Sequence, residues 1–230
     1  MRAIVIIVSI FIFNIACAQL PTPSEKSAIL EQVQVYRNQE KYKKAYQLLK
    51  PLADNGDADA NFALGELYDY SDDRNPYYDP NKSIDALYIA AKQGHAWAQM
   101  ALGLNLKRRL RDIKDRNSEE FRNTFKESCD WKTKGALQGA QFGASAVAEC
   151  HETGGFTGKP DYVQAYAWHA VSEILKETGN DSLEADFDNT QFMRQTAKRG
   201  KLTEAQKQQA LKIARDIATQ IKANLAKKPH

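Results

Sequence analysis

The chain has 230 residues, of which 43% are hydrophobic and 27% are charged, and its formal net charge at pH 7 is +3. This composition excludes a disordered chain, and the length is sufficient for one domain with a continuous core. The weak charge balance gives no reason to expect a nucleic-acid partner.

The first eighteen residues differ from the rest of the chain. Arg2 precedes an apolar run at residues 4–15, and residues 16–18 form a small-x-small cleavage site. This order is typical of a secretory signal, because the apolar run is too short for a stable membrane span. An alternative makes Cys17 a lipidated residue, although Asn14 stands where a bacterial lipoprotein signal usually has leucine. No second long apolar run follows, so we expect a periplasmic or secreted protein without a membrane span.

Residues 24–54 predict a helical hairpin. Ser24 can cap a first helix, in which Ile29, Val33 and Tyr36 recur three to four residues apart. A second helix follows with apolar residues at the same spacing between Tyr42 and Leu52. Neither helix alone can bury its apolar stripe, so we expect the two to pack together.

An imperfect repeat follows this hairpin. The pattern Gly-x-x-x-small-x-x-x-apolar-small-x-x-large begins at Gly56, Gly94 and Gly139. Each copy predicts a helix followed by a partner helix, and each glycine suits a left-handed position at a helix end. The second interval is seven residues longer than the first, and the basic residues 107–116 are the expected insertion.

The residues after the third copy predict a closing element. Residues 185–198 can form a short helix, and the capping box from Thr203 to Gln206 opens a final amphipathic helix. A polar terminal element of this kind closes a helical array. We therefore divide the chain into a signal peptide at residues 1–18, a repeat array at 19–178 and capping helices at 179–230.

The repeat resembles the Sel-one-like repeats (SLRs), a branch of the tetratricopeptide-like solenoids. The resemblance is carried by residues 56–68 and 90–94, by Trp131 with residues 136–139, and by residues 165–168. It implies an all-α fold, a right-handed α/α solenoid of about four helix pairs with a C-terminal capping helix. It also implies that the first helix of each pair lines a concave surface used for protein contacts.

Two cysteines remain after signal removal, Cys129 and Cys150. They lie ten residues before and eleven residues after Gly139, so they are level on two antiparallel helices. We predict a disulfide between them, since an exported protein folds in an oxidising compartment. The alternative is a pair of buried free thiols.

Catalytic patterns are scarce. The sequence contains neither Ser-x-x-Lys nor Gly-x-Ser-x-Gly, the two common serine-acylation signatures, and His95, His151 and His169 are isolated. We therefore predict a protein that is not an enzyme and holds no cofactor or metal. The alternative function is a cell-wall or β-lactam hydrolase, which some exported relatives of the repeat family have been associated with.

The concave surface is the predicted binding site. Residues on the first helices that do not face the core combine aromatic anchors with charged neighbours, as protein-binding grooves do. The alternative is that Trp97, Met100 and Leu104 pack against the preceding unit. The predicted groove residues are Asp59, Phe62, Glu66, Tyr70, Trp97, Met100, Leu104, Arg108, Phe142 and Glu149.

We thus expect a monomer that binds another protein. A periplasmic immunity protein against a secreted effector and an envelope adaptor are the two forms considered.

Overall fold

The computed structural model describes residues 21–140, 142–176 and 188–227. The predicted signal peptide, including Cys17, lies outside these residues. Over the described residues the regular structure is entirely α-helical. No helix among them is long and apolar enough to cross a membrane. The helices are α1 (Pro23–Asn38), α2 (Tyr42–Asp54), α3 (Ala58–Asp69), α4 (Pro80–Lys92), α5 (Ala96–Arg109), α6 (Glu119–Leu137), α7 (Gly143–Glu152), α8 (Tyr162–Lys176), α9 (Asn189–Gly200) and α10 (Glu204–Leu225).

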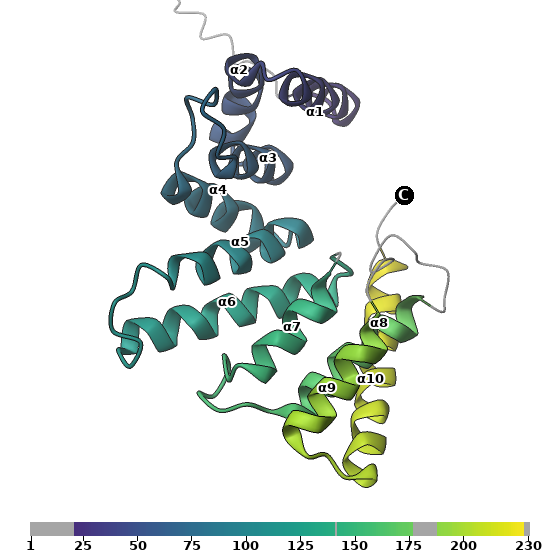
Figure 1. Cartoon of the computed structure of the whole chain (residues 1–230). Helices are drawn as coiled ribbons and strands as arrows, with labels where there is room; N and C mark the ends of the chain where they lie inside the picture. The colour runs from purple at the N-terminus through teal and green to yellow at the C-terminus, as the bar shows by residue number, and fades with distance from the viewer. Residues whose placement is uncertain (1–20, 141, 177–187, 228–230) are drawn as a thin grey trace, which may run out of the picture.

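The first eight helices form four hairpins stacked in chain order. Each helix from α1 to α8 packs on the next one along the chain, and the stack runs from α1 and α2 at one end to α9 and α10 at the other (Figure 1). Such a stack is held by contacts between neighbours in sequence. This arrangement confirms the all-α solenoid of about four helix pairs with a C-terminal cap.

The turns between hairpins depend on the glycines that open each repeat. Gly56, Gly94 and Gly139 have φ angles of 80°, 89° and 80°, a left-handed conformation that other residues adopt at a cost. In the first two copies an amide five residues later ties the turn. Asn61 donates from Nδ2 to a carbonyl of α2 at 3.0 Å, and Gln99 donates from Nε2 to a carbonyl of α4 at 3.1 Å.

Two predicted helix starts are tested by the caps. Thr203 caps α10 and forms the expected capping box. The predicted cap at Ser24 is wrong, because α1 begins at Pro23 and Thr22 is its N-cap. Thr22 places Pro23 at the first helical position and Glu25 at the third, so a proline-first helix and a capping box form together.

The C-terminal helices close the stack. Both α9 and α10 pack on α8, and α10 also reaches α6, where Asn224 donates from Nδ2 to the Leu137 carbonyl at 2.8 Å. Ala210, Ala214 and Ile221 of α10 are buried in the same apolar cluster as Val147 of α7. The last unit is therefore covered by the end of the chain rather than exposed.

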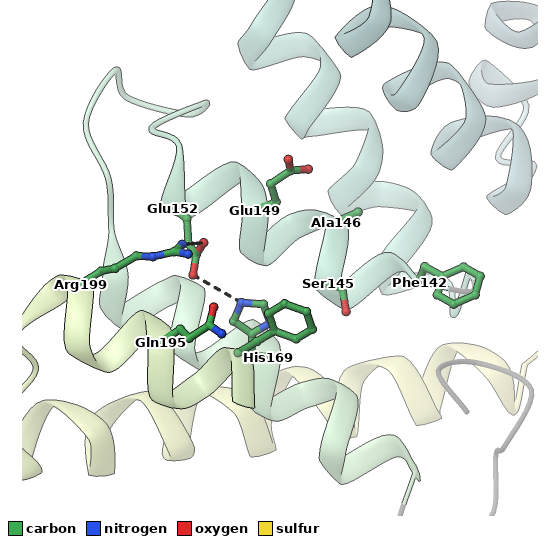
Figure 2. Close-up of a pocket in the computed structure, with 9 residues that line it drawn as sticks. Phe142, Ser145, Ala146, Glu149, Glu152, His169, Gln195 and Arg199 are labelled. Carbon is green, nitrogen blue, oxygen red and sulfur yellow. Dashed lines mark hydrogen bonds and ion pairs between the residues drawn. The ribbon is translucent and has the colours of Figure 1, made fainter. Parts of the chain in front are cut away.

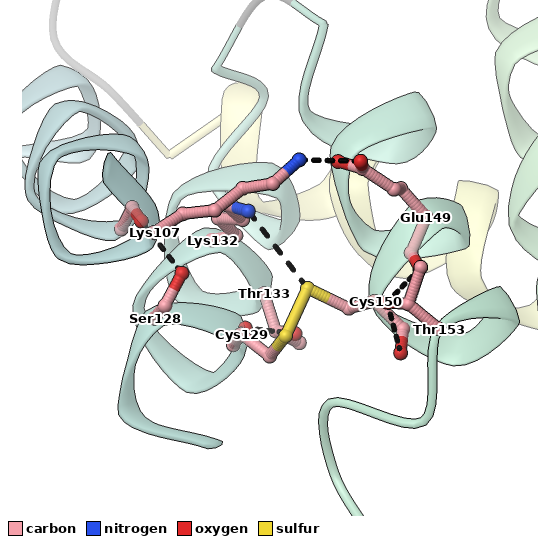
Figure 3. Close-up of a disulfide and its surroundings, with 9 residues drawn as sticks. Lys107, Ser128, Cys129, Lys132, Thr133, Glu149, Cys150 and Thr153 are labelled. Carbon is pink, nitrogen blue, oxygen red and sulfur yellow. Dashed lines mark hydrogen bonds and ion pairs between the residues drawn. A yellow bond between two sulfur atoms is a disulfide. The ribbon is translucent and has the colours of Figure 1, made fainter. Parts of the chain in front are cut away.

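The predicted disulfide joins α6 to α7. Cys129 and Cys150 are bonded, with their Cα atoms 5.7 Å apart (Figure 3). Both residues are buried. The bond ties the third hairpin, α5 and α6, to the fourth, α7 and α8.

A lysine lies fully buried beside this disulfide. Lys132 of α6 has 0% exposure, and its Nζ is 4.0 Å from the Cys150 Sγ, below the Lys107–Glu149 pair in the view of Figure 3. Burial and, to a smaller extent, the nearby Lys107 lower the pKa of Lys132 to about 8, while Glu149 opposes the shift. Lys132 thus carries a charge that the fold accommodates poorly.

Candidate protein-binding face

The odd-numbered helices lie along one face and are joined to one another by ion pairs. Arg37 of α1 pairs with Glu66 of α3 at 2.8 Å, and Arg108 of α5 pairs with Asp69 of α3. Two further pairs, Lys107–Glu149 and Arg199–Glu152, link α5 to α7 and α7 to α9. We call this surface the odd-helix face. Its side chains are those of Asp59, Phe62, Glu66, Tyr70, Trp97, Leu104, Arg108, Phe142, Ser145, Glu149, Glu152, Phe192, Gln195 and Arg199.

The first part of this face is held by charge and stacking. Asp59 accepts from Lys26 of α1 at 2.7 Å and lies 3.4 Å from the His95 Nε2 at the start of α5. The Phe62 ring stacks on His95 with centroids 4.5 Å apart. These contacts fix the spacing of α1, α3 and α5, and they also occupy much of the polar surface of Asp59.

Large apolar side chains stand exposed along the same face. Tyr70, Trp97, Leu104, Phe142 and Phe192 are 50%, 46%, 45%, 44% and 39% exposed. Trp97 and Leu104 are seven residues apart, which places them on one side of α5. Nearly half of the surface of each of these two residues is open to solvent, so the alternative in which they pack into the preceding unit can account for only part of each side chain.

Met100 does not belong to this face. It is only 5% exposed and packs in the apolar cluster of α6, α7 and α8, so its assignment to the groove is wrong. The reason lies in its neighbours, because Gly135 and Gly143 allow α6 and α7 to approach the base of the Met100 side chain and its methyl group. The other predicted groove residues are all at least partly exposed, and their role in binding stays a prediction.

A pocket of about 470 Å³ opens between α7 and α9. Its walls are mainly apolar, with Phe142 and Ala146 at the α7 side and His169 of α8 in the lining (Figure 2). Phe192 of α9 lines the pocket as well. This volume is within the range of ligand pockets. The remaining lining residues are Ser145, Glu149, Glu152, Gln195 and Arg199.

Glu152 is the most constrained polar group of this pocket. Its carboxylate accepts from Arg199 at 2.8 Å and from the Thr196 hydroxyl, and it lies 3.6 Å from the His169 Nε2. The His169 contact, followed by that of Thr196, lowers the pKa of Glu152, so it is ionised at neutral pH. With His169 Nε2–H directed at Glu152, the other ring nitrogen Nδ1 is an acceptor that is buried and has no hydrogen-bond partner among the described residues.

This arrangement offers positioned acceptors and aromatic walls, but no assembled nucleophile. Among the described residues no group of three or more His, Cys, Asp and Glu side chains is placed to hold a metal ion. Ser145 shares the pocket with His169, yet its hydroxyl contacts the Asn189 side chain at 3.3 Å. The geometry therefore suits recognition of a side chain or peptide.

The sequence does not predict the pocket, because three of its nine lining residues come from α9. Phe192, Gln195 and Arg199 lie outside the three repeat copies, so no repeated position marks them as surface residues of this face. In the sequence His169 is an isolated histidine. The Ser145 and Glu152 positions were visible as non-core residues of the third copy, which is the signal that points to this end of the face.

Lys132 was also missed, although the repeat contains its signal. It stands seven residues before Gly139, where the preceding unit has Leu87 seven residues before Gly94. Leu87 is buried against Gly65, and Lys132 is buried against the equivalent Gly103. A lysine at a core leucine position of a repeat marks a buried charge.

Comparison with known proteins gives one solved structure to report. No protein-family model and no curated protein sequence matches the chain. The chain is similar to a crystal structure described as a protective antigen present in uropathogenic Escherichia coli strains and displaying an SLR fold, with 21% identity and a TM-score of 0.42. The match covers 90% of this chain and 50% of that one, so the chain spans half the length of the protein it matches. The identity is too low to transfer a function, and the four stacked hairpins establish the solenoid independently.

Proposed function

We propose that this chain is a non-catalytic, exported repeat protein that binds another protein through its odd-helix face. In this proposal the odd-helix face serves as the concave surface that the SLR resemblance implies. The observation that carries the proposal is the row of exposed apolar side chains on α5, α7 and α9, since such residues are the usual anchors of protein interfaces.

The ion pairs along the face support the same function. They link successive odd-numbered helices and hold the exposed aromatic residues at fixed separations before a partner arrives. A preorganised surface loses little conformational entropy on binding. The disulfide between α6 and α7 further fits a protein that works in an oxidising compartment outside the cytoplasm.

Two forms of this function are proposed for an exported chain. One is a periplasmic immunity protein that masks a secreted effector, and the other is an envelope adaptor. An immunity protein should be encoded beside its effector and bind it with a Kd in the nanomolar range or tighter, whereas an adaptor should be recovered with envelope components at weaker affinity.

The test is a pulldown from the native periplasm with matched surface variants. Trp97→Ala on α5 and Phe142→Ala at the start of α7 should each weaken capture of the partner by at least tenfold. Ile89→Ala on α4 is the control, because Ile89 is 45% exposed, much like Trp97 at 46%, but lies on an even-numbered helix. Loss of capture in the Ile89 variant alone would refute binding through the odd-helix face.

The competing hydrolase function has a direct assay. A β-lactam or cell-wall hydrolase would turn over a chromogenic lactam or a labelled muropeptide. Turnover at a rate that scales with protein concentration would refute the non-catalytic proposal.

A further inference from the structure

The pocket between α7 and α9 has a chemistry of its own, distinct from the rest of the odd-helix face. Its two aromatic rings, Phe142 and Phe192, are 44% and 39% exposed, so ring surface is available to an occupant. Phe142 precedes α7, whereas Phe192 belongs to α9 and its ring stacks on that of His169 with centroids 5.5 Å apart. An occupant between them needs a flat or apolar body.

The polar groups of the pocket are mostly acceptors. Glu149 and Glu152 contribute two carboxylates, and the buried His169 contributes the Nδ1 acceptor that has no hydrogen-bond partner among the described residues. The one cation in the lining, Arg199, is already bonded to Glu152. Gln195 and Ser145 also line the pocket and can each donate or accept, so the charged groups of the lining are two carboxylates against one guanidinium.

We propose that this pocket receives an arginine side chain of the bound protein. A guanidinium brings five N–H donors and no acceptor, which matches an acceptor-rich site. Its plane stacks on aromatic rings, and its three methylenes pack against apolar walls such as Ala146. The positive charge complements the surplus carboxylate of the lining.

Glu149 is the group that the incoming guanidinium engages. Its side chain is 46% exposed, whereas the Glu152 side chain is 16% exposed and is held by Arg199 and Thr196. In the free protein Glu149 pairs with Lys107, whose side chain is 42% exposed. Lys107 thus competes with the guest for the same carboxylate, as a cation that must be displaced.

This inference rests on the proposed function, but its test does not require the natural partner. The full chain, labelled with ¹⁵N, is titrated with N-acetyl-arginine methylamide while the amide resonances of α7 and α9 are followed. We expect saturable shifts at the pocket residues with a Kd near 1 mM, a range common for single side-chain fragments. N-acetyl-citrulline methylamide has the same size without the charge and should bind at least tenfold more weakly.

Three variants make the assignment specific. Glu149→Gln should weaken arginine binding by about tenfold because it removes a charge-assisted hydrogen bond. Lys107→Met should tighten it by removing the competing cation. Glu120→Gln changes an exposed carboxylate on α6 and should leave the Kd unchanged.

Two results would overturn the inference. One is the absence of saturable shifts at the pocket up to about 20 mM arginine probe, well above the millimolar Kd expected of a fragment. The other is equal binding of the arginine and citrulline probes. Either result would leave the odd-helix face open as a protein-binding surface, and a failed pulldown with successful arginine binding would reject only the proposed function.

Discussion

Replacing the buried lysine of α6 by methionine should stabilise the protein at neutral pH. Lys132→Met keeps an unbranched side chain of similar length in the space beside Gly103 while removing a charge that has 0% exposure. Buried charges are frequently replaced by apolar residues of similar volume with a gain in stability.

The size of the effect follows from the pKa of Lys132. Its pKa falls from 10.5 in the unfolded chain to about 8 in the folded one, so between these values the unfolded state binds more protons than the folded state. Stability contributed by this position therefore rises with pH across that window. The penalty at pH 7 is about 3 kcal/mol, and it decreases by about 2 kcal/mol on going to pH 9.5.

Guanidinium denaturation of the wild type and the variant at both pH values measures this difference. Comparing the two proteins at each pH removes the contribution of tyrosines, because Tyr68 and Tyr88 keep their protons in the folded state to higher pH in both. Lys212→Met on the exposed side of α10 is the control and should show no pH-dependent difference. A Lys132→Met protein whose advantage is the same at pH 7 and pH 9.5 would refute the assignment of a depressed lysine pKa.

Three other perturbations have defined outcomes. Replacing both Cys129 and Cys150 by alanine removes a cross-link between residues 21 positions apart and should lower the free energy of unfolding by about 3 kcal/mol. Guanidinium denaturation measures this, and an unchanged midpoint would show that the bond adds no stability. Gly103→Ala should lower the Tm, because the added Cβ would lie 2.7 Å from the Ser128 carbonyl oxygen where α5 contacts α6. A Tm equal to that of the wild type in a calorimetric scan would contradict this close approach. Glu152→Gln should reduce the loss of unfolding free energy at acid pH. The lowered pKa of Glu152 gives stability that is present above pH 4.5 and is lost as the pH falls through the folded-state pKa. Urea denaturation from pH 7 down to about pH 3 tests this, and parallel plots of unfolding free energy against pH for the two proteins would show that folding does not stabilise the carboxylate.

The helices and turns could be predicted because their signals are local. Apolar residues at helical spacing, the capping box at Thr203, and the glycines that open each repeat each act within a few residues of the chain. The cap at Thr22 was the local exception. Ser24 is an equally good capping residue by type, and the choice depends on which start also satisfies the proline and Glu25.

The candidate site could be predicted only in part, because side-chain direction and non-repeated elements decide the rest. Met100 and Trp97 both read as non-core residues of α5, but their side chains point about 60° apart around the helix axis, and only Met100 meets the glycines of α6 and α7. The α7–α9 pocket depends on α9, whose position follows from contacts with α8 and α7 that no sequence periodicity encodes.

The burial of α10 against α6 and α8 also determines when the protein can finish folding. The apolar cluster around α1, α2 and α3 is complete once about the first third of the chain has been synthesised, because all its buried members lie between Val33 and Tyr68. The C-terminal cluster extends to Ile221, and Asn224 reaches back to Leu137. A nascent chain therefore carries an incomplete C-terminal cluster until α10 has emerged, and a protein shortened by the final turns of α10 should be the form that proteases and chaperones recognise.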